Sequence, residues 1–148
     1  MLELKSILES WEQDCIIDDT HLDTTSRETP KLHAKYLKLL SEAKLQLKRS
    51  ELKQKTLLND KWLWYNGKMA REEMEEKGWD PDPFNGLKIM KGEMECCYDS
   101  DLEIQKTEEL IAYWKTLIET LTDIIDTLKW RHQTIRNMIS WRQFESGN

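Results

Sequence analysis

The chain has 148 residues, of which 34% are charged and 39% are hydrophobic, and its formal net charge is −6. It contains only five Gly and three Pro residues, and its regular apolar spacing predicts long helices rather than a β-sandwich. Seven Trp residues argue against a disordered chain, because disorder usually accompanies a lack of aromatic residues. The length is that of one domain, and we expect residues 1–148 to form a single all-α domain.

The three cysteines, Cys15, Cys96 and Cys97, favour reduced thiols over a disulfide framework or a zinc site. Their number is odd and no C-x-x-C spacing occurs. Reactive adjacent thiols at Cys96 and Cys97 are the less favoured alternative. The N-terminal residues are acidic where a secretory signal is basic, and no apolar run reaches the length of a membrane span. We therefore expect a cytoplasmic protein with no membrane partner.

The N-terminal segment, residues 1–66, is predicted to be helical. A short amphipathic helix is expected over residues 2–11, and a continuous helix from about Pro30 to Asn66, with a helical lead-in from His21. The pair Asn66-Gly67 suits positive φ and should end this helix.

Residues 67–99 form an acidic, irregular region. Within it, residues 69–77 have the signal for two helical turns, whereas residues 87–98 are compatible with an extended or a helical conformation. A capping box, Ser100-x-x-Glu103, predicts that the last helix begins near Ser100 and occupies most of residues 100–148.

The last helix has the clearest apolar pattern in the chain, and we expect it to drive oligomerisation. Apolar residues form a heptad seam that His132 interrupts, and a third column beside the seam is interrupted by Arg131. The predicted oligomerisation residues are Leu110, Ile111, Trp114, Leu117, Ile118, Leu121, Ile124, Ile125, Leu128, Ile135, Met138 and Ile139. A face this broad predicts a long antiparallel helical hairpin that assembles into a ring-shaped homo-oligomer. The alternative is a monomer of three or four helices with the same stripe as its core.

Charge is segmented along the chain. Residues 31–68 contain ten basic and three acidic residues, a net charge of +7, whereas the net charge is −6 in residues 1–30 and −8 in residues 69–109. Cations that contact phosphates and rings that stack on bases hold single-stranded nucleic acid without sequence preference. The candidate DNA-binding residues are Lys48, Arg49, Lys53, Lys55, Lys61, Trp62, Trp64 and Lys68. A solvated basic helix whose aromatic residues fill the core is the open alternative.

No motif indicates catalysis, a metal or a cofactor. The sequence lacks a Walker loop, G-x-G-x-x-G, G-x-S-x-G and H-E-x-x-H. None of His21, His33 and His132 has a partner at metal-ligand spacing, and no pair of carboxylates is singled out for acid–base chemistry. We expect a protein that is not an enzyme and that requires no cofactor.

Several segments, taken together, resemble the UvsY family of recombination mediators of T-even-type phages. They are residues 17–22 (IDDTHL), the lysine-rich helix leading to residues 64–67 (WYNG), the pairs at 93–94 and 113–114, and the ending at residues 143–148 (QFESGN). The resemblance covers nearly the whole chain except residues 67–90, where this chain is longer and more acidic. It rests on order and spacing rather than on one diagnostic motif.

The resemblance implies a phage protein of recombination and repair that acts in the infected bacterial host. It implies single-stranded DNA binding, assembly as a hexamer or heptamer through the C-terminal segment, and loading of a RecA-like recombinase onto DNA covered by single-strand DNA-binding protein. The family's basic DNA-contacting pair aligns with residues 58–62, where Lys61 takes the second basic position, Asn59 replaces the first and Asp60 lies between them. The competing hypothesis is a helical coiled-coil scaffold or adaptor that binds no nucleic acid.

Overall fold

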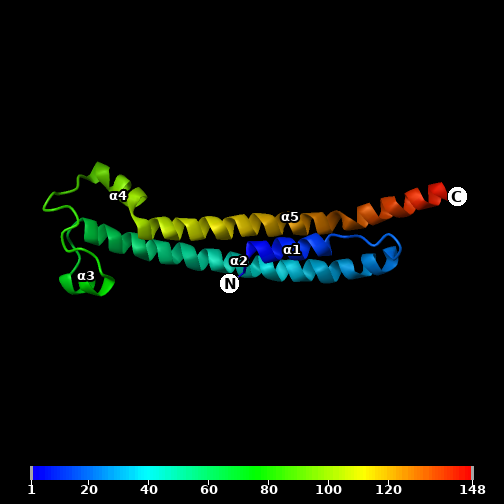
Figure 1. Cartoon of the computed structure of the whole chain (residues 1–148), viewed down its shortest axis with the longest axis horizontal. Helices are drawn as coiled ribbons and strands as arrows, with labels where there is room; N and C mark the ends of the chain where they lie inside the picture. Colours follow the sequence, from blue (N-terminus) through cyan, green and yellow to red (C-terminus); the bar gives the residue numbers. More distant parts are fainter. Residues whose placement is uncertain (1, 148) are drawn as a thin grey trace. The chain divides into compact units, whose positions relative to one another are not determined.

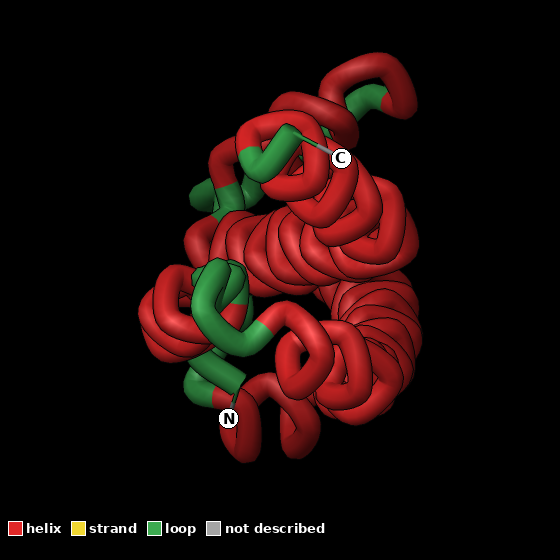
Figure 2. The backbone as a smooth tube through the Cα atoms, turned by 90° about the vertical axis from the view of Figure 1, so that its right-hand side faces the viewer, coloured by secondary structure: helices red, strands yellow, loops and turns green. Residues whose placement is uncertain are grey.

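The computed structural model describes residues 2–147, and every regular element in them is a helix (Figures 1 and 2). In chain order the elements are α1 (Leu4–Asp14), α2 (Leu22–Tyr65), α3 (Arg71–Lys77), the short 3-10 helix η1 (Lys91–Glu93), α4 (Met94–Ser100) and α5 (Leu102–Glu145). The predicted all-α class is confirmed. No helix in the described part of the chain has both the length and the apolar character needed to span a membrane.

The chain divides into two compact units. The terminal unit comprises the residues up to Gln46 and from Trp114 onward, and the middle unit comprises Leu47–Tyr113. Helices α2 and α5 each contribute a segment to both units. Each unit buries its own set of apolar side chains.

Helix α2 begins at Leu22 rather than near Pro30, so Pro30 lies inside the helix. Proline lacks the N–H that would bond the carbonyl of Ser26, but both residues are exposed, and water can solvate this carbonyl. The helix therefore continues through the proline. At its other end, α2 stops at Tyr65, and the positive φ of Gly67 (67°) reverses the chain as predicted.

Helix α5 begins at Leu102, close to the predicted start near Ser100, but Asp101 and not Ser100 occupies the N-cap position. The Asp101 carboxylate accepts hydrogen bonds from the backbone N–H groups of Glu103 at 2.9 Å and Ile104 at 3.2 Å, as an N-cap does. Ser100 instead ends α4, where its hydroxyl donates to the carbonyl of Cys96 at 2.9 Å. The predicted capping box was therefore wrong by one residue, since both neighbours are competent caps and tertiary contacts favour Asp101.

The irregular region contains both of the conformations that the sequence left open. Residues 87–90 are not helical, whereas η1 and α4 make residues 91–100 helical. Helix α3 provides the two turns predicted within residues 69–77.

Within the terminal unit, α1 packs against α2. The rings of Trp11 and Tyr36 meet edge to face with their centroids 5.5 Å apart. Tyr36 is fully buried, and its hydroxyl donates to the carboxylate of Asp14 at 2.7 Å. Burial, and then this bond to a carboxylate, raise the pKa of Tyr36 to about 12, so the hydroxyl remains a donor at neutral pH.

The arginine that interrupts the third apolar column has a structural role in the same unit. Arg131 is 7% exposed, and its guanidinium donates to the carbonyl oxygens of Asp14 at 2.9 Å and Ile16 at 3.1 Å. These carbonyls lie at the C-terminal end of α1, where backbone acceptors have no helical partner. Arg131 thus joins the end of α1 to α5.

Most of the predicted oligomerisation residues are buried by the chain itself. The buried members are Ile111, Trp114, Leu117, Leu121, Ile124, Ile125, Leu128 and Ile135. Ile118 and Met138 are half-buried, and only Leu110 and Ile139 are exposed. For these eight buried residues, the alternative prediction holds: they form part of the chain's own core. A heptad pattern identifies an apolar face but does not identify what covers it.

Candidate nucleic-acid interface

A row of side chains follows the exposed side of α2 in the middle unit. Lys48, Leu52, Lys55, Asn59 and Trp62 recur at four- and three-residue steps, so they share one face of the helix. All five are exposed, and none is acidic. The row therefore presents positive charge that ends at an aromatic ring.

Two further exposed cations, Arg49 and Lys53, flank this row. Within residues 2–147, neither they nor Lys48 and Lys55 are held in an ion pair. We call these four cations, together with Trp62, the basic face. Flexible side chains with uncompensated charge are suited to phosphate contacts that do not depend on sequence.

Trp62 and Lys68, both predicted DNA-binding residues, are brought together at the end of the basic face. Trp62 is 39% exposed, and Lys68 Nζ lies 4.7 Å from the centroid of its ring. An exposed indole offers a surface on which a base can stack, and the adjacent ammonium can contact the phosphate of the same nucleotide.

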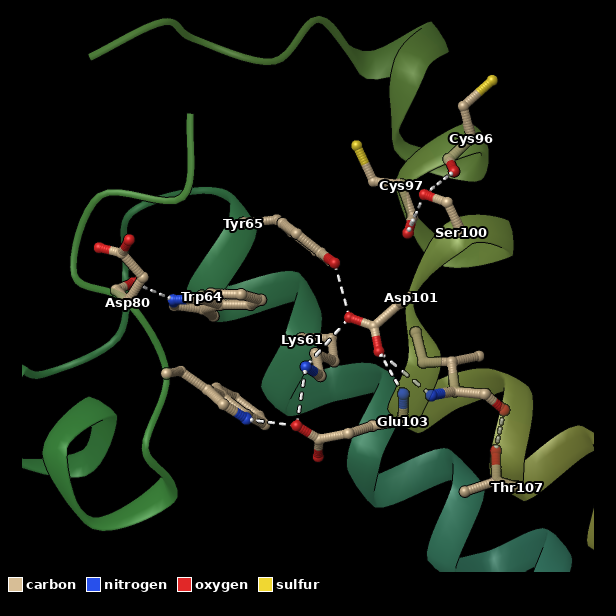
Figure 3. A network of polar contacts seen from close by, with 12 residues as sticks. Lys61, Trp64, Tyr65, Asp80, Cys96, Cys97, Ser100, Asp101, Glu103 and Thr107 are labelled. Atoms are coloured by element: carbon tan, nitrogen blue, oxygen red, sulfur yellow. Dashed lines mark hydrogen bonds and ion pairs between the residues drawn. The ribbon is translucent and has the colours of Figure 1, made fainter. Parts of the chain in front are cut away.

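Lys61, in contrast, is not part of the basic face. It is 3% exposed, and its ammonium lies 3.0 Å from an Asp101 oxygen and 3.4 Å from a Glu103 oxygen (Figure 3). The ring centroids of Trp64 and Trp79 lie 4.6 and 4.1 Å from the same nitrogen. Because this cation is enclosed by two carboxylates and two rings, it cannot reach a phosphate in this structure. The predicted DNA contact by Lys61 is therefore corrected to a structural role.

Each carboxylate near Lys61 also accepts a hydrogen bond from an aromatic side chain. The Tyr65 hydroxyl donates to Asp101 at 2.6 Å (Figure 3). The Trp79 indole N–H donates to Glu103 at 2.7 Å. Burial acts to raise the pKa of Asp101, but hydrogen bonds from Tyr65 and Lys61 outweigh it and lower this pKa overall. Burial and the adjacent carboxylate raise the pKa of Tyr65. Asp101 is thus ionised at neutral pH and Tyr65 is neutral, which matches the roles of acceptor and donor.

The two residues that depart from the family's basic pair do not place negative charge on the basic face. Asn59 is neutral and lies in the row itself. Asp60 is half-buried, points to another side of α2 and is paired with Lys77, whose Nζ lies 3.3 Å from its carboxylate. The charge of Asp60 is thereby compensated within the middle unit.

Trp64 is half-buried and lies outside the exposed row. Its indole N–H donates to the carbonyl of Asp80 at 2.7 Å (Figure 3). Its ring lies 5.1 Å from that of Trp79. It packs on a buried cluster formed by Met69, Met74 and Trp79. Trp64 therefore differs from the prediction: it holds the loop after α3 instead of extending the basic face.

The terminal unit has one exposed feature that the sequence pattern did not predict. Trp130, Trp141 and Phe144 are 68%, 61% and 71% exposed, and the last two rings stack with centroids 5.5 Å apart. They lie on the side of α5 away from the buried seam, in a row completed by Thr134 and Asn137 at four- and three-residue steps. We call the three aromatic residues the aromatic stripe. The heptad spacing could have revealed it, but the polar residues between the rings concealed it.

Similarity to known proteins extends over nearly the whole chain. Residues 10–148 match the family model described as "Recombination, repair and ssDNA binding protein UvsY". The recombination protein uvsY of Enterobacteria phage T4 is 25% identical over 146 residues, which cover 99% of each chain.

Crystal structures of the bacteriophage T4 recombination mediator protein UvsY have the same fold. Lattice type II superposes with a TM-score of 0.83 at 24% identity over 99% of both chains. Lattice type I gives a TM-score of 0.79 at 25% identity over 95% of this chain and 98% of the other. The chain therefore belongs to the UvsY family of recombination, repair and single-stranded DNA-binding proteins.

Proposed function

We propose that this protein is a recombination mediator that binds single-stranded DNA through the basic face and promotes loading of a RecA-like recombinase onto DNA covered by single-strand DNA-binding protein. The observation that carries the proposal is the row of exposed cations ending at Trp62, in a chain of a single-stranded DNA-binding family. The T4 relative is itself named a recombination mediator.

The proposed binding is weak at each contact and strong in sum. Lys48 and Lys55 are separated by about 10 Å along α2, so their contacts are distributed along a strand rather than focused on one phosphate. In a ring-shaped hexamer or heptamer the basic face would be repeated, and repetition raises the effective concentration of each contact. A strand held in this way is open to recombinase nucleation, and the hold of the covering protein on it is weakened. The proposal also includes direct contacts of this protein with the recombinase and with the single-strand DNA-binding protein.

The loading step is tested by following ATP hydrolysis of a RecA-like recombinase on single-stranded DNA. We expect a long lag when the DNA is first saturated with single-strand DNA-binding protein, and a shorter lag after this protein is added. On bare DNA the addition should change little, because no competitor needs to be displaced. An unchanged lag over the full range of stoichiometry would refute the mediator proposal, whereas absence of any DNA binding would favour the scaffold hypothesis.

We propose that the aromatic stripe forms the interface with a second copy of the chain, because exposed rings at heptad spacing are typical of an association site. The double variant Trp141→Ser with Phe144→Ser should lower the mass measured by light scattering toward that of a single chain, while helix content is retained. Leu45→Ser, at a residue that is 61% exposed on α2, is the matched control and should leave the mass unchanged. A double variant that keeps the full mass would exclude this surface from the interface.

A further inference from the structure

The middle unit contains a pocket at the C-terminal end of α2 that the basic face does not include. Its volume is about 390 Å³, within the range of roughly 300–1,000 Å³ typical of small-molecule sites. Its walls include the aromatic and proline residues Trp64, Tyr65, Pro83 and Phe84. Asn66 and Lys88 contribute polar groups to the lining.

Two of the rings in the wall are fixed by hydrogen bonds at their polar ends. The Tyr65 hydroxyl is bound to Asp101 at 2.6 Å, and the Trp64 indole N–H is bound to the Asp80 carbonyl at 2.7 Å (Figure 3). The Phe84 ring lies 5.5 Å from that of Tyr65, and their planes are inclined by 35°. Rings whose orientation is fixed before binding lose little conformational entropy when a flat ligand stacks on them.

The pocket lies next to the basic face along the chain. Asn66 and Gly67, which line it, follow the last turn of α2 directly, and Lys68 reaches back over the ring of Trp62. A strand that follows the cations of the basic face as far as Trp62 therefore ends only a few residues from the pocket lining.

The pocket chemistry fits a neutral, flat, hydrogen-bonding group. The charged lining residues are one acid and one base, Asp82 and Lys88, so the pocket has no net charge that would select an ion. The side-chain nitrogen of Asn66 donates to the carbonyl of Trp62 at 2.7 Å, and its side-chain oxygen has the capacity to accept from an amino group. Aromatic walls with a few polar groups are how proteins hold an unstacked base.

We propose that this pocket receives one nucleobase of the single-stranded DNA, with Phe84 as the ring on which the base stacks. The inference rests on the proposed function and adds a base-holding subsite to its phosphate contacts. Because such a subsite binds π faces rather than phosphates, its contribution to affinity is independent of salt concentration.

The test is Phe84→Leu, which keeps an apolar side chain in the wall but removes the ring. Affinity for a fluorescent single-stranded oligonucleotide should fall roughly tenfold, with no change in the slope of log affinity against log salt. Phe84→Tyr should restore binding. Met90→Ala, at a 72% exposed residue of the same loop that does not line the pocket, is the matched control.

An oligonucleotide of abasic sites separates base stacking from other effects. On this probe the wild-type protein and Phe84→Leu should bind equally, since neither can place a base in the pocket. Normal affinity of Phe84→Leu for ordinary single-stranded DNA would refute base binding in the pocket and leave the proposed function intact. A loss of Phe84→Leu affinity for abasic DNA equal to its loss for ordinary DNA would have the same meaning. If the wild-type protein binds no single-stranded DNA, the proposed function itself fails.

Discussion

Asp101→Ala is expected to lower the free energy of unfolding by about 4 kcal/mol. Removal of this carboxylate leaves the Lys61 ammonium, which is 3% exposed, with only the half-exposed Glu103 as a partner, and breaking a buried ion pair typically costs about 3–5 kcal/mol. It also removes the N-cap of α5, a loss of about 1 kcal/mol. Urea unfolding followed by far-UV circular dichroism and tryptophan fluorescence measures the change.

Two further variants divide this effect into its parts. Asp101→Asn keeps a competent capping residue and loses only the charge, so its stability should lie between those of the wild type and Asp101→Ala. Asp99→Ala removes an exposed carboxylate from the preceding helix and should change stability by less than about 0.5 kcal/mol. Equal stability of Asp101→Ala and Asp99→Ala would show that the buried pair contributes nothing to the fold.

The same carboxylate makes stability depend on pH. The pKa of Asp101 is lowered in the folded state from its ordinary value of 3.8, so the folded protein binds this proton less readily than the unfolded chain does. The stabilisation is therefore complete above about pH 4 and is lost as the pH falls through the lowered pKa. Asp101→Asn should show a flatter fall in stability over this acidic range. A parallel fall in both proteins would assign the acid sensitivity to other groups.

The triple variant Lys48→Gln, Lys53→Gln and Lys55→Gln should bind single-stranded DNA about a hundredfold more weakly at moderate salt. Each phosphate contact on a single strand contributes roughly 0.7 to the slope of log affinity against log salt, so three lost contacts should reduce the slope by about 2. All three side chains are exposed, and glutamine keeps helix propensity, so the fold should be unaffected. Fluorescence anisotropy across a salt series measures both quantities.

A matched change of charge elsewhere tests whether the position of the cations matters. Lys106→Gln, Lys115→Gln and Lys129→Gln remove three exposed lysines from α5 and change the net charge equally. This control should retain nearly the wild-type slope. Similar losses in the two triple variants would mean that overall charge, and not the basic face, determines binding.

Local signals predicted the helices well, and distant partners explain where the prediction failed. The end of α2 was predictable because Gly67 adopts a positive φ that few other residues tolerate. The start of α5 was displaced by one residue because Ser100 and Asp101 are both good caps, and the contacts of Asp101 with Lys61 and Tyr65 are not visible in local sequence.

In the candidate site, too, local signals predicted some features and contacts distant in sequence determined others. The spacing of the cations on α2 predicted which of them are exposed, but Lys61 has the same local pattern and is buried. Its burial could not be predicted locally, because its partners Asp101 and Glu103 lie about forty residues further along the chain. Trp62 and Trp64 are two residues apart, yet only Trp62 is on the exposed side of the helix. Helical periodicity separates such neighbours only once the buried side is known.

The enclosure of Lys61 also gives the molecule an internal chemical reporter. A lysine must be accessible to react with an acylating reagent, and the Lys61 ammonium is 3% exposed and enclosed by two carboxylates and two indole rings. In the folded protein it should remain unmodified while the lysines of the basic face are labelled, and DNA should protect those lysines without altering Lys61. Labelling of Lys61 would then report local unfolding of the middle unit. One mass spectrum would therefore distinguish DNA binding at the basic face from local unfolding around Lys61.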